Sequence, residues 1–328
     1  MTVLLTGATG FVGLNIARAL LDRGERVVLF APTPPPEALS AGWLGAARFI
    51  SGDVRVPDDL DRAFAAAAID RVIHAAALTP DMRAEAEQPE VIAEVNLGGT
   101  LRLMQAARRA GVRRVLGLSS VAVYGHAAAE ADGRLHEEST PTRPAALYGI
   151  TKLAAEQAVH RLGALYGMET AAVRLGPCFG AREHPTGMRP LLSPHWQCVE
   201  DARAGRECVL PRAMAADWID AEAAAGAIAD LLALPAPERA TFNLGGGALT
   251  TAAAWCEALV ALCPGFRWRI DPEAATVRYG LERDRAPMDT TRLRAATGRA
   301  PLTDDLPGLA RRYLDWRNGP EGIALCGA

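Results

Sequence analysis

Lysine is almost absent from this sequence. Among its 35 Lys and Arg residues, Lys152 is the one lysine and all the others are arginines. Lysine differs from arginine in its compact ammonium group, whose pKa shifts readily with its surroundings. Lys152 also follows Tyr148, one of only five tyrosines, by four residues. Because this spacing places both side chains on the same face of a helix, one turn apart, we expect the pair to act together.

Excess charge and long apolar runs are also missing. The formal net charge is −3, with acidic and basic residues interspersed, which excludes the basic surface typical of nucleic-acid binding. No segment approaches the roughly 18 apolar residues that a membrane-spanning helix needs. The first 13 residues have no basic region, and glycines interrupt their apolar run, so they do not resemble a signal peptide. We therefore expect a cytoplasmic protein that does not associate with membranes.

Cysteine pairs with metal-ligand spacing are absent as well. The six cysteines lie at positions 178, 198, 208, 256, 263 and 326, and none of them forms a CxxC pair. In a chain of this length, such spacing indicates reduced thiols in a cytoplasmic protein. The sequence therefore predicts no metal site.

Short apolar runs alternate with helical segments through the first half of the chain. Predicted strands cover residues 2–7, 26–31, 47–53, 71–77, 114–120 and 170–176. Predicted helices cover residues 11–24, 58–67, 91–111 and 147–167. Buried strands that alternate with helices indicate an α/β fold with a doubly wound parallel sheet, a Rossmann domain.

The pattern changes after about residue 176. The segment 177–196 is rich in Pro and Gly and mixes charged with aromatic residues, as in a loop that covers a site. Helices are predicted near 195–204, 250–263 and 306–317. We expect residues 1–175, joined by about 214–245, to form the cofactor-binding domain, and residues 176–328 to form mainly a smaller substrate-binding domain.

A glycine-rich turn follows the first predicted strand. The segment TGATGFVG places Gly7, Gly10 and Gly13 between this strand and the first helix. Glycines at such a turn let the backbone approach a pyrophosphate, and the helix N-terminus offers amide N–H groups and a positive dipole to the phosphates. The turn therefore predicts a nucleotide cofactor.

The GxxGxxG spacing at 7–13, together with YxxxK at 148–152, resembles the extended short-chain dehydrogenase/reductase family, of the NAD-dependent epimerase/dehydratase type. The segments GDV (52–54), HAAA (74–77), NLGGT (96–100) and SSVAVYG (119–125) follow in the order of that family. The resemblance implies an NAD or NADP cofactor and a homodimer. It also implies the cofactor-binding residues Gly7, Gly10, Phe11, Val12, Gly13, Ala31, Asp53, Val54, Ala75, Ala76, Ala77, Asn96, Tyr148 and Lys152.

The resemblance assigns catalysis to Ser120, Tyr148 and Lys152. A Tyr phenol has an ordinary pKa of about 10, and a nearby ammonium together with a nicotinamide cation would lower it. Tyr148 could then take a proton from a substrate hydroxyl while hydride leaves the same carbon. Lys152 would supply the charge and bind the nicotinamide ribose, and Ser120 would donate a hydrogen bond to the reacting oxygen.

Three departures from the family pattern bear on the substrate. Dehydratases carry Thr-Asp-Glu where this chain has Ser120, Val121 and Ala122, so it lacks the acid and base that elimination needs. Nucleotide-sugar epimerases have Asn and Arg in place of Pro177 and Ala216, and both grip pyrophosphate.

The third departure is Ala31, because NAD-preferring members have an acidic residue at that position. No Arg follows to bind a 2′-phosphate, so NAD is slightly favoured over NADP.

We therefore predict an NAD(P)-dependent oxidoreductase that acts on a sugar or sugar-derived alcohol. A nucleotide-sugar epimerase of the UDP-hexose 4-epimerase type is the alternative. A third hypothesis is a protein that senses NAD(P) without turnover, although a sensor would not need the Ser120–Tyr148–Lys152 set. Residues expected to contact the substrate are Thr79, Ser120, Arg182, His184 and Arg189.

Overall fold

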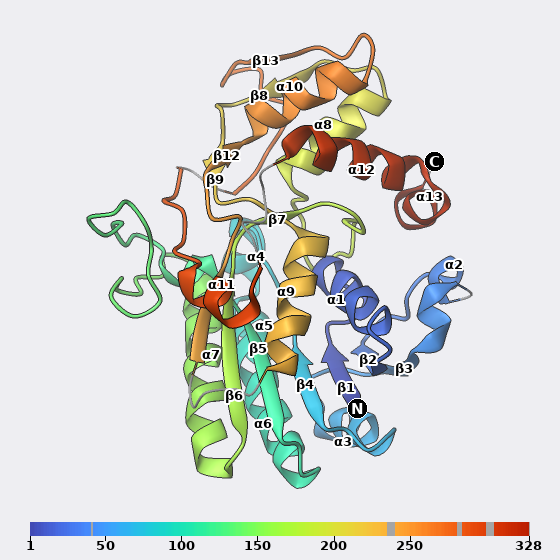
Figure 1. Ribbon diagram of the computed structural model, residues 1–328, viewed down its shortest axis with the longest axis vertical. Helices are drawn as coiled ribbons and strands as arrows, with labels where there is room; N and C mark the ends of the chain where they lie inside the picture. The colour runs from blue at the N-terminus through green and yellow to red at the C-terminus, as the bar shows by residue number, and fades with distance from the viewer. Residues whose placement is uncertain (41, 235–239, 281–283, 300–304, 328) are drawn as a thin grey trace.

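A seven-stranded sheet forms the centre of the computed structural model, which describes residues 1–40, 42–234, 240–280, 284–299 and 305–327 (Figure 1). The strand order is β11-β6-β5-β4-β1-β2-β3, and every neighbouring pair is parallel. These strands are β1 (Thr2–Thr6), β2 (Arg26–Ala31), β3 (Arg48–Ser51), β4 (Arg71–His74), β5 (Arg114–Ser120), β6 (Glu169–Leu175) and β11 (Ala240–Leu244). The predicted α/β class and parallel sheet are confirmed.

Helices cover both faces of this sheet, and the alternation of side chains along β1 shows why. Val3 and Leu5 pack in one apolar cluster with α1 (Phe11–Leu21) and α9 (Ala221–Ala233). Leu4 points to the opposite face and joins a second cluster. That cluster includes residues of α3 (Pro57–Ala65), α6 (Gly99–Arg109) and α7 (Leu147–Tyr166). Because β1 is buried on both faces, it is a continuous apolar run instead of an alternating one.

The helix predicted over 91–111 is interrupted in the structure. It consists of α5 (Pro89–Ala93), a π-helical turn η2 (Glu94–Gly98) and α6. A π turn adds one residue to a helical turn, and such turns are frequent at functional sites. Asn96 lies in this turn and is buried, 1% exposed.

A third apolar cluster lies in the part of the chain beyond β6, at the top of Figure 1. Its helices are α8 (Pro194–Arg203), α10 (Ala252–Leu262) and α12 (Leu306–Asn318). Three two-stranded pairings accompany it: β7 (Cys178–Phe179) with β10 (Ile219–Asp220), β8 (Cys208–Leu210) with β13 (Trp268–Ile270), and β9 (Ala215–Ala216) with β12 (Thr250–Thr251).

Strands of two or three residues are too short to produce a sequence pattern, so they escaped prediction. Other short elements are α2 (Glu37–Ser40), η1 (Trp43–Ala46), α4 (Met82–Glu87), η3 (Val121–Val123), α11 (Thr291–Thr297) and α13 (Pro320–Cys326). The chain returns to the central sheet at β11, which pairs with β6. The division into two domains stays a prediction. Within the described ranges, the helices are too short or too polar to cross a membrane.

Candidate active site

The predicted site motifs follow three neighbouring strands at their carboxyl ends. The glycine turn follows β1, the HAAA segment extends from β4, and Ser120 ends β5. The chain runs from β1 to β2 and β3 on one side of the sheet, whereas β4, β5 and β6 lie on the other side. In open parallel sheets, ligands bind at such a reversal of strand order, outside the carboxyl ends of the strands.

The turn after β1 requires its glycines. Gly7 has a φ of +66°, in the left-handed region, and a Cβ atom there would lie 2.7 Å from the Ala76 amide nitrogen. A Cβ atom on Gly13 would lie 2.1 Å from the Gly7 carbonyl oxygen. α1 begins after Gly10 with no side-chain cap and no acidic residue in its first turn. The first-turn amides of Phe11, Val12 and Gly13 therefore meet no competing side chain, which fits a diphosphate group.

The residues expected at the adenosine end lie beside this turn. Ala31 is buried at the end of β2, and its carbonyl oxygen accepts a 3.1 Å hydrogen bond from the Gly52 amide. Asp53 is one-quarter exposed, and a 2.6 Å ion pair with Arg55 lowers the pKa of its carboxyl group. Val54 is buried against α6, where a Cβ atom on Gly99 would lie 2.6 Å from it. At the expected adenosine end, Asp53 thus provides a polar side chain and Val54 an apolar one.

Asn96 joins the segment after β4 to α7. Its side-chain oxygen accepts a 2.8 Å hydrogen bond from the Leu78 amide, and its Nδ2 donates to the Leu78 carbonyl at 3.1 Å. The same Nδ2 lies 3.1 Å from the hydroxyl of Thr151 on α7. The π turn thus directs one amide side chain between two segments that carry predicted cofactor-binding residues, Ala77 and Lys152.

Replacement of Asn96 by Ala is expected to destabilise the fold by about 2–4 kcal/mol, because each buried polar group left without a partner costs about 1–3 kcal/mol. Chemical denaturation measures the loss. Asn318→Ala is the matched control: this exposed amide accepts a hydrogen bond from Arg203 at the surface, so the change should stay within about 0.5 kcal/mol. Equal losses in both variants would contradict the bridging role.

Three hydroxyl groups meet where β5, α7 and the segment after β4 come together. Tyr148, on the first turn of α7, has the side chains of Ser120 and Thr79 close enough to its phenol to lower the pKa of that group. The Ser120 Oγ also accepts a 3.1 Å hydrogen bond from the Ala122 amide, which fixes its orientation. The structure therefore brings together the predicted residues Ser120 and Tyr148, and it adds the predicted substrate residue Thr79 to the same cluster.

The expected depression of the Tyr148 pKa is absent in the protein alone. Burial raises the pKa of Tyr148, and the neighbouring side chains of Ser120 and Thr79 and the charge of Arg189 only partly oppose this rise. The cation that acts on the phenol is therefore Arg189, from the loop after β7, which the sequence analysis predicted only as a substrate contact. Without a further positive charge nearby, such as the nicotinamide cation, Tyr148 is protonated at neutral pH.

Lys152 is buried, 5% exposed, one helical turn after Tyr148. Burial lowers the pKa of Lys152 to about 8, and the nearby Glu156 carboxylate partly opposes this shift. Glu156 itself forms a 2.7 Å ion pair with Arg174 of β6, and both side chains are nearly inaccessible. His74 of β4 lies close enough to experience the Lys152 charge. The single ammonium thus lies in the interior with a titratable pKa, as a lysine permits and an arginine does not.

Arg182 and His184 differ from the expectation that they contact substrate. Arg182 is 6% exposed and has a φ of +66°. Its guanidinium binds Glu222 at 2.8 Å and Glu321 at 2.8 Å, and it donates to the Asn15 side chain at 2.9 Å. These ion pairs occupy its donors with protein groups, so we leave Arg182 out of the substrate site.

His184 is 8% exposed, and its Nδ1 lies 2.8 Å from the Arg182 carbonyl oxygen. Burial lowers its pKa, so the ring is neutral at pH 7.

Arg189 is the loop arginine that faces the hydroxyl cluster. Besides Tyr148, its guanidinium interacts with Glu183 at 3.5 Å. The Thr79 amide donates to the Met188 carbonyl at 3.1 Å, which holds this part of the loop beside Thr79. Arg189 thus lies where a cation could bind an anionic or hydroxyl-rich ligand.

Sequence patterns missed Glu183, which anchors this loop. Its carboxylate is fully buried and accepts hydrogen bonds from both the amide and the hydroxyl of Ser193, each at 2.6 Å. Ser193 caps α8 by accepting from the Trp196 amide. Only its position between the predicted residues Arg182 and His184 could have drawn attention to Glu183. The carboxylate connects Arg189 to the start of α8.

Comparison with known proteins gives a consistent result. The sequence model of the NAD dependent epimerase/dehydratase family matches residues 3–245. The UDP-glucose 4-epimerase of Streptomyces lividans is 31% identical over 259 residues, which cover 74% of this chain and 75% of that protein. Sterol demethylase protein B of Methylococcus capsulatus is 35% identical over 194 residues, but these cover only 55% of its length.

Solved structures share the whole architecture. The UDP-glucose 4-epimerase of Thermus thermophilus, in complex with NAD, superposes with a TM-score of 0.78 at 25% identity, over 98% of this chain and 100% of that one. The Bifidobacterium longum UDP-glucose 4-epimerase, in complex with NAD⁺ and UDP, gives a TM-score of 0.83 at 23% identity, with the same coverage of both chains. Both comparisons extend beyond the central sheet to the segments that follow β6.

Proposed function

Because the chain belongs to the NAD dependent epimerase/dehydratase family, we propose that it epimerises a sugar carbon through reversible oxidation of the hydroxyl group on that carbon. The observation that carries this proposal is the placement of the Ser120 and Thr79 side chains beside Tyr148, with Lys152 one turn along α7. This cluster can move a proton at a secondary alcohol. Similarity to the Streptomyces lividans 4-epimerase favours epimerisation over net oxidation.

NAD is the cofactor that family membership implies, and the turn after β1 fits it. Gly10, Phe11, Val12 and Gly13 would hold the diphosphate at the uncapped start of α1. Asp53 and Val54 would line the adenine side, and Ala75–Ala77 the wall nearest β4. When bound, NAD supplies the hydride acceptor and donor for the reacting carbon.

The protein groups then provide proton transfer. The Tyr148 phenol oxygen accepts the proton of the sugar hydroxyl during oxidation and returns it during reduction. Lys152 and Arg189 stabilise the phenolate that forms, because an opposite charge nearby favours the ionised state. Ser120 and Thr79 orient the phenol and the reacting oxygen by hydrogen bonding.

Two positions lack the side-chain donors that would bind a substrate pyrophosphate, and we expect this to lower the affinity for a nucleotide sugar. Pro177 presents no side-chain donor, and its carbonyl oxygen is already bonded to the Ile219 amide at 3.0 Å. Ala216 is 2% exposed within the C-terminal apolar cluster. Since each lost charged contact costs about 1.5–3 kcal/mol, we expect UDP to bind weaker than micromolar, with a Kd of about 1 mM.

The test combines calorimetric titration with UDP and product analysis. UDP-glucose, UDP-galactose and a panel of free sugars and sugar acids are each incubated with NAD and the protein at high substrate concentration. Epimer formation without accumulation of NADH supports the proposal, and Tyr148→Phe should abolish it. Stoichiometric NADH from a free sugar or sugar acid would favour the second candidate, net oxidation. Binding of NAD with neither product would instead favour a sensor.

A further inference from the structure

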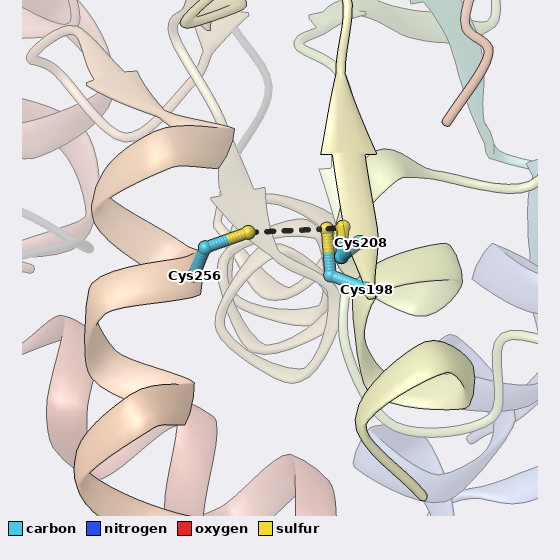
Figure 2. A group of neighbouring side chains, drawn as sticks. All are labelled: Cys198, Cys208 and Cys256. Atoms are coloured by element: carbon cyan, nitrogen blue, oxygen red, sulfur yellow. Dashed lines mark hydrogen bonds between the residues drawn. The ribbon is translucent and has the colours of Figure 1, made fainter. Parts of the chain in front are cut away.

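Three of the six cysteines converge inside the C-terminal apolar cluster (Figure 2). Cys198 comes from α8, Cys208 from β8 and Cys256 from α10, and the side chains of all three are fully buried. The Sγ atom of Cys198 lies 3.4 Å from that of Cys208 and 3.5 Å from that of Cys256. Sequence spacing predicted no such group, because three separate elements bring the sulfurs together.

The sulfur positions fit one shared ion. A bond of about 2.3 Å to each sulfur places two sulfurs that share an ion about 3.4–4.0 Å apart, for angles from pyramidal (about 95°) to trigonal (120°). In this cluster the three Sγ atoms all lie within 4.8 Å of one another. Small torsional changes would bring them to bonding distance of a common centre. Among the described residues, no His, Asp or Glu completes the group as a fourth ligand.

Charge limits which ion such a cluster can hold. Its surroundings are apolar side chains such as Trp255 and Leu259, and the carboxylates of Glu257 and Asp201 interact electrostatically with the cysteines. A net negative complex would be costly here, because it is buried and faces acidic neighbours. Three thiolates carry three negative charges. The complex with Zn²⁺ would have a net charge of about −1 and the complex with Cu⁺ about −2, whereas the complex with a trivalent ion would be neutral.

We propose that Cys198, Cys208 and Cys256 form a three-thiolate binding site for a trivalent thiophilic ion, with arsenic(III) as its probe. Arsenous acid condenses with three thiols: three As–O bonds break, three As–S bonds form, and the thiol protons leave in three water molecules. No oxidation state changes. The product is neutral, and soft thiolate ligands favour such soft ions.

Access to the cluster depends on local opening. The sulfurs are fully buried, so α8 or α10 must move before a ligand enters. Arsenite should therefore bind slowly to the native protein and faster in urea below the unfolding transition. Bound arsenic would connect α8, β8 and α10, and a ligand that binds only the folded state raises the thermal midpoint.

The experiment uses the full reduced chain with arsenite, measured by native mass spectrometry and thermal unfolding. We expect one arsenic per chain and a higher thermal midpoint. Cys198→Ala and Cys256→Ala should each weaken binding by at least about tenfold, since even losses outside the ligand shell cost about 10–100-fold in metal affinity. The matched controls are Cys263→Ala and Cys326→Ala, because these thiols are more exposed and do not belong to the group of three cysteines. Both variants should bind arsenic like the wild type.

A second measurement, on the wild-type protein, tests the proposal even if the cysteine variants do not fold. In wild-type protein with sub-denaturing urea, arsenite should protect Cys198, Cys208 and Cys256 from alkylation, but not Cys263. Absence of bound arsenic, undiminished binding in Cys198→Ala, or equal protection of Cys263 would overturn the proposal. Tighter binding of Zn²⁺ than of arsenite would overturn the charge argument on which the choice of ion rests.

Discussion

Tyr148→Phe and Lys152→Arg are each expected to lower kcat by about 10²–10⁴-fold, the usual contribution of a positioned acid–base group. Phenylalanine removes the oxygen that carries the proton. Arginine keeps the positive charge but needs more space in a position that is 5% exposed. Steady-state kinetics of epimer formation measures both effects, and circular dichroism shows whether the fold persists.

Matched controls lie on the same helix. Tyr166→Phe, at the end of α7, and Arg161→Lys, on its exposed surface, should retain wild-type kcat. Wild-type turnover in Tyr148→Phe or Lys152→Arg would refute the proposed proton transfer.

Lys152→Met supplies an independent readout of the buried charge. Burial lowers the Lys152 pKa from its ordinary value of 10.5 to about 8, so the charged form destabilises the fold below pH 8, and this cost disappears as the pH rises toward 10.5. Each pKa unit corresponds to about 1.4 kcal/mol, and Lys152→Met should therefore be more stable at pH 7 by about 1–3 kcal/mol, though inactive. Reduced stability would mean that Lys152 supports the fold instead of the chemistry.

Acid is expected to destabilise the wild-type protein, and His195→Phe should remove part of that effect. The His195 ring is fully buried, stacks on Phe179 at 4.0 Å, and has no hydrogen-bond partner on either nitrogen within the described part of the chain. Burial lowers its pKa from 6.5 to about 3. Below pH 6.5 the unfolded chain therefore binds a proton on this ring, whereas the folded protein does not. The free energy of unfolding consequently decreases as the pH is lowered.

Between pH 7 and pH 5, this single group costs about 2 kcal/mol, so His195→Phe should lose about 2 kcal/mol less stability than wild type over that interval. His74, whose pKa burial also lowers to about 3, acts in the same direction in both proteins. Asp217 and Asp220, whose pKa values burial raises to about 6, gain stability as pH falls, again equally in both. Their contributions cancel in the comparison.

Urea denaturation at several pH values measures how the free energy of unfolding depends on pH in the wild type and in His195→Phe. His136→Gln serves as control, because this ring is partly exposed and paired with Asp132 at 2.9 Å, unlike the buried His195 ring. Parallel slopes for wild type and His195→Phe would show that the buried ring is not the source of acid sensitivity.

The sequence by itself determined the parallel sheet and the glycine turn after β1, because buried apolar runs and closely spaced glycines are both visible within single segments. Apolar runs such as Thr2–Thr6 can only be buried strands in this context, and Gly7 and Gly13 occupy positions where a Cβ atom would clash. The YxxxK spacing likewise placed Tyr148 and Lys152 on one helix. These features can be recognised from residue types and spacings within single segments, even though the contact that excludes a Cβ atom at Gly7 is with Ala76, in the distant segment after β4.

Only the tertiary structure decided how distant residues share their partners. Arg182 looked available for substrate, but Glu321, 139 residues away, and Glu222 occupy its guanidinium. Cys198 and Cys256 showed no ligand spacing, yet α8 and α10 bring their sulfurs within 3.5 Å. Long-range ion pairs and sulfur contacts depend on how helices pack against one another, and no local pattern of residues records that packing.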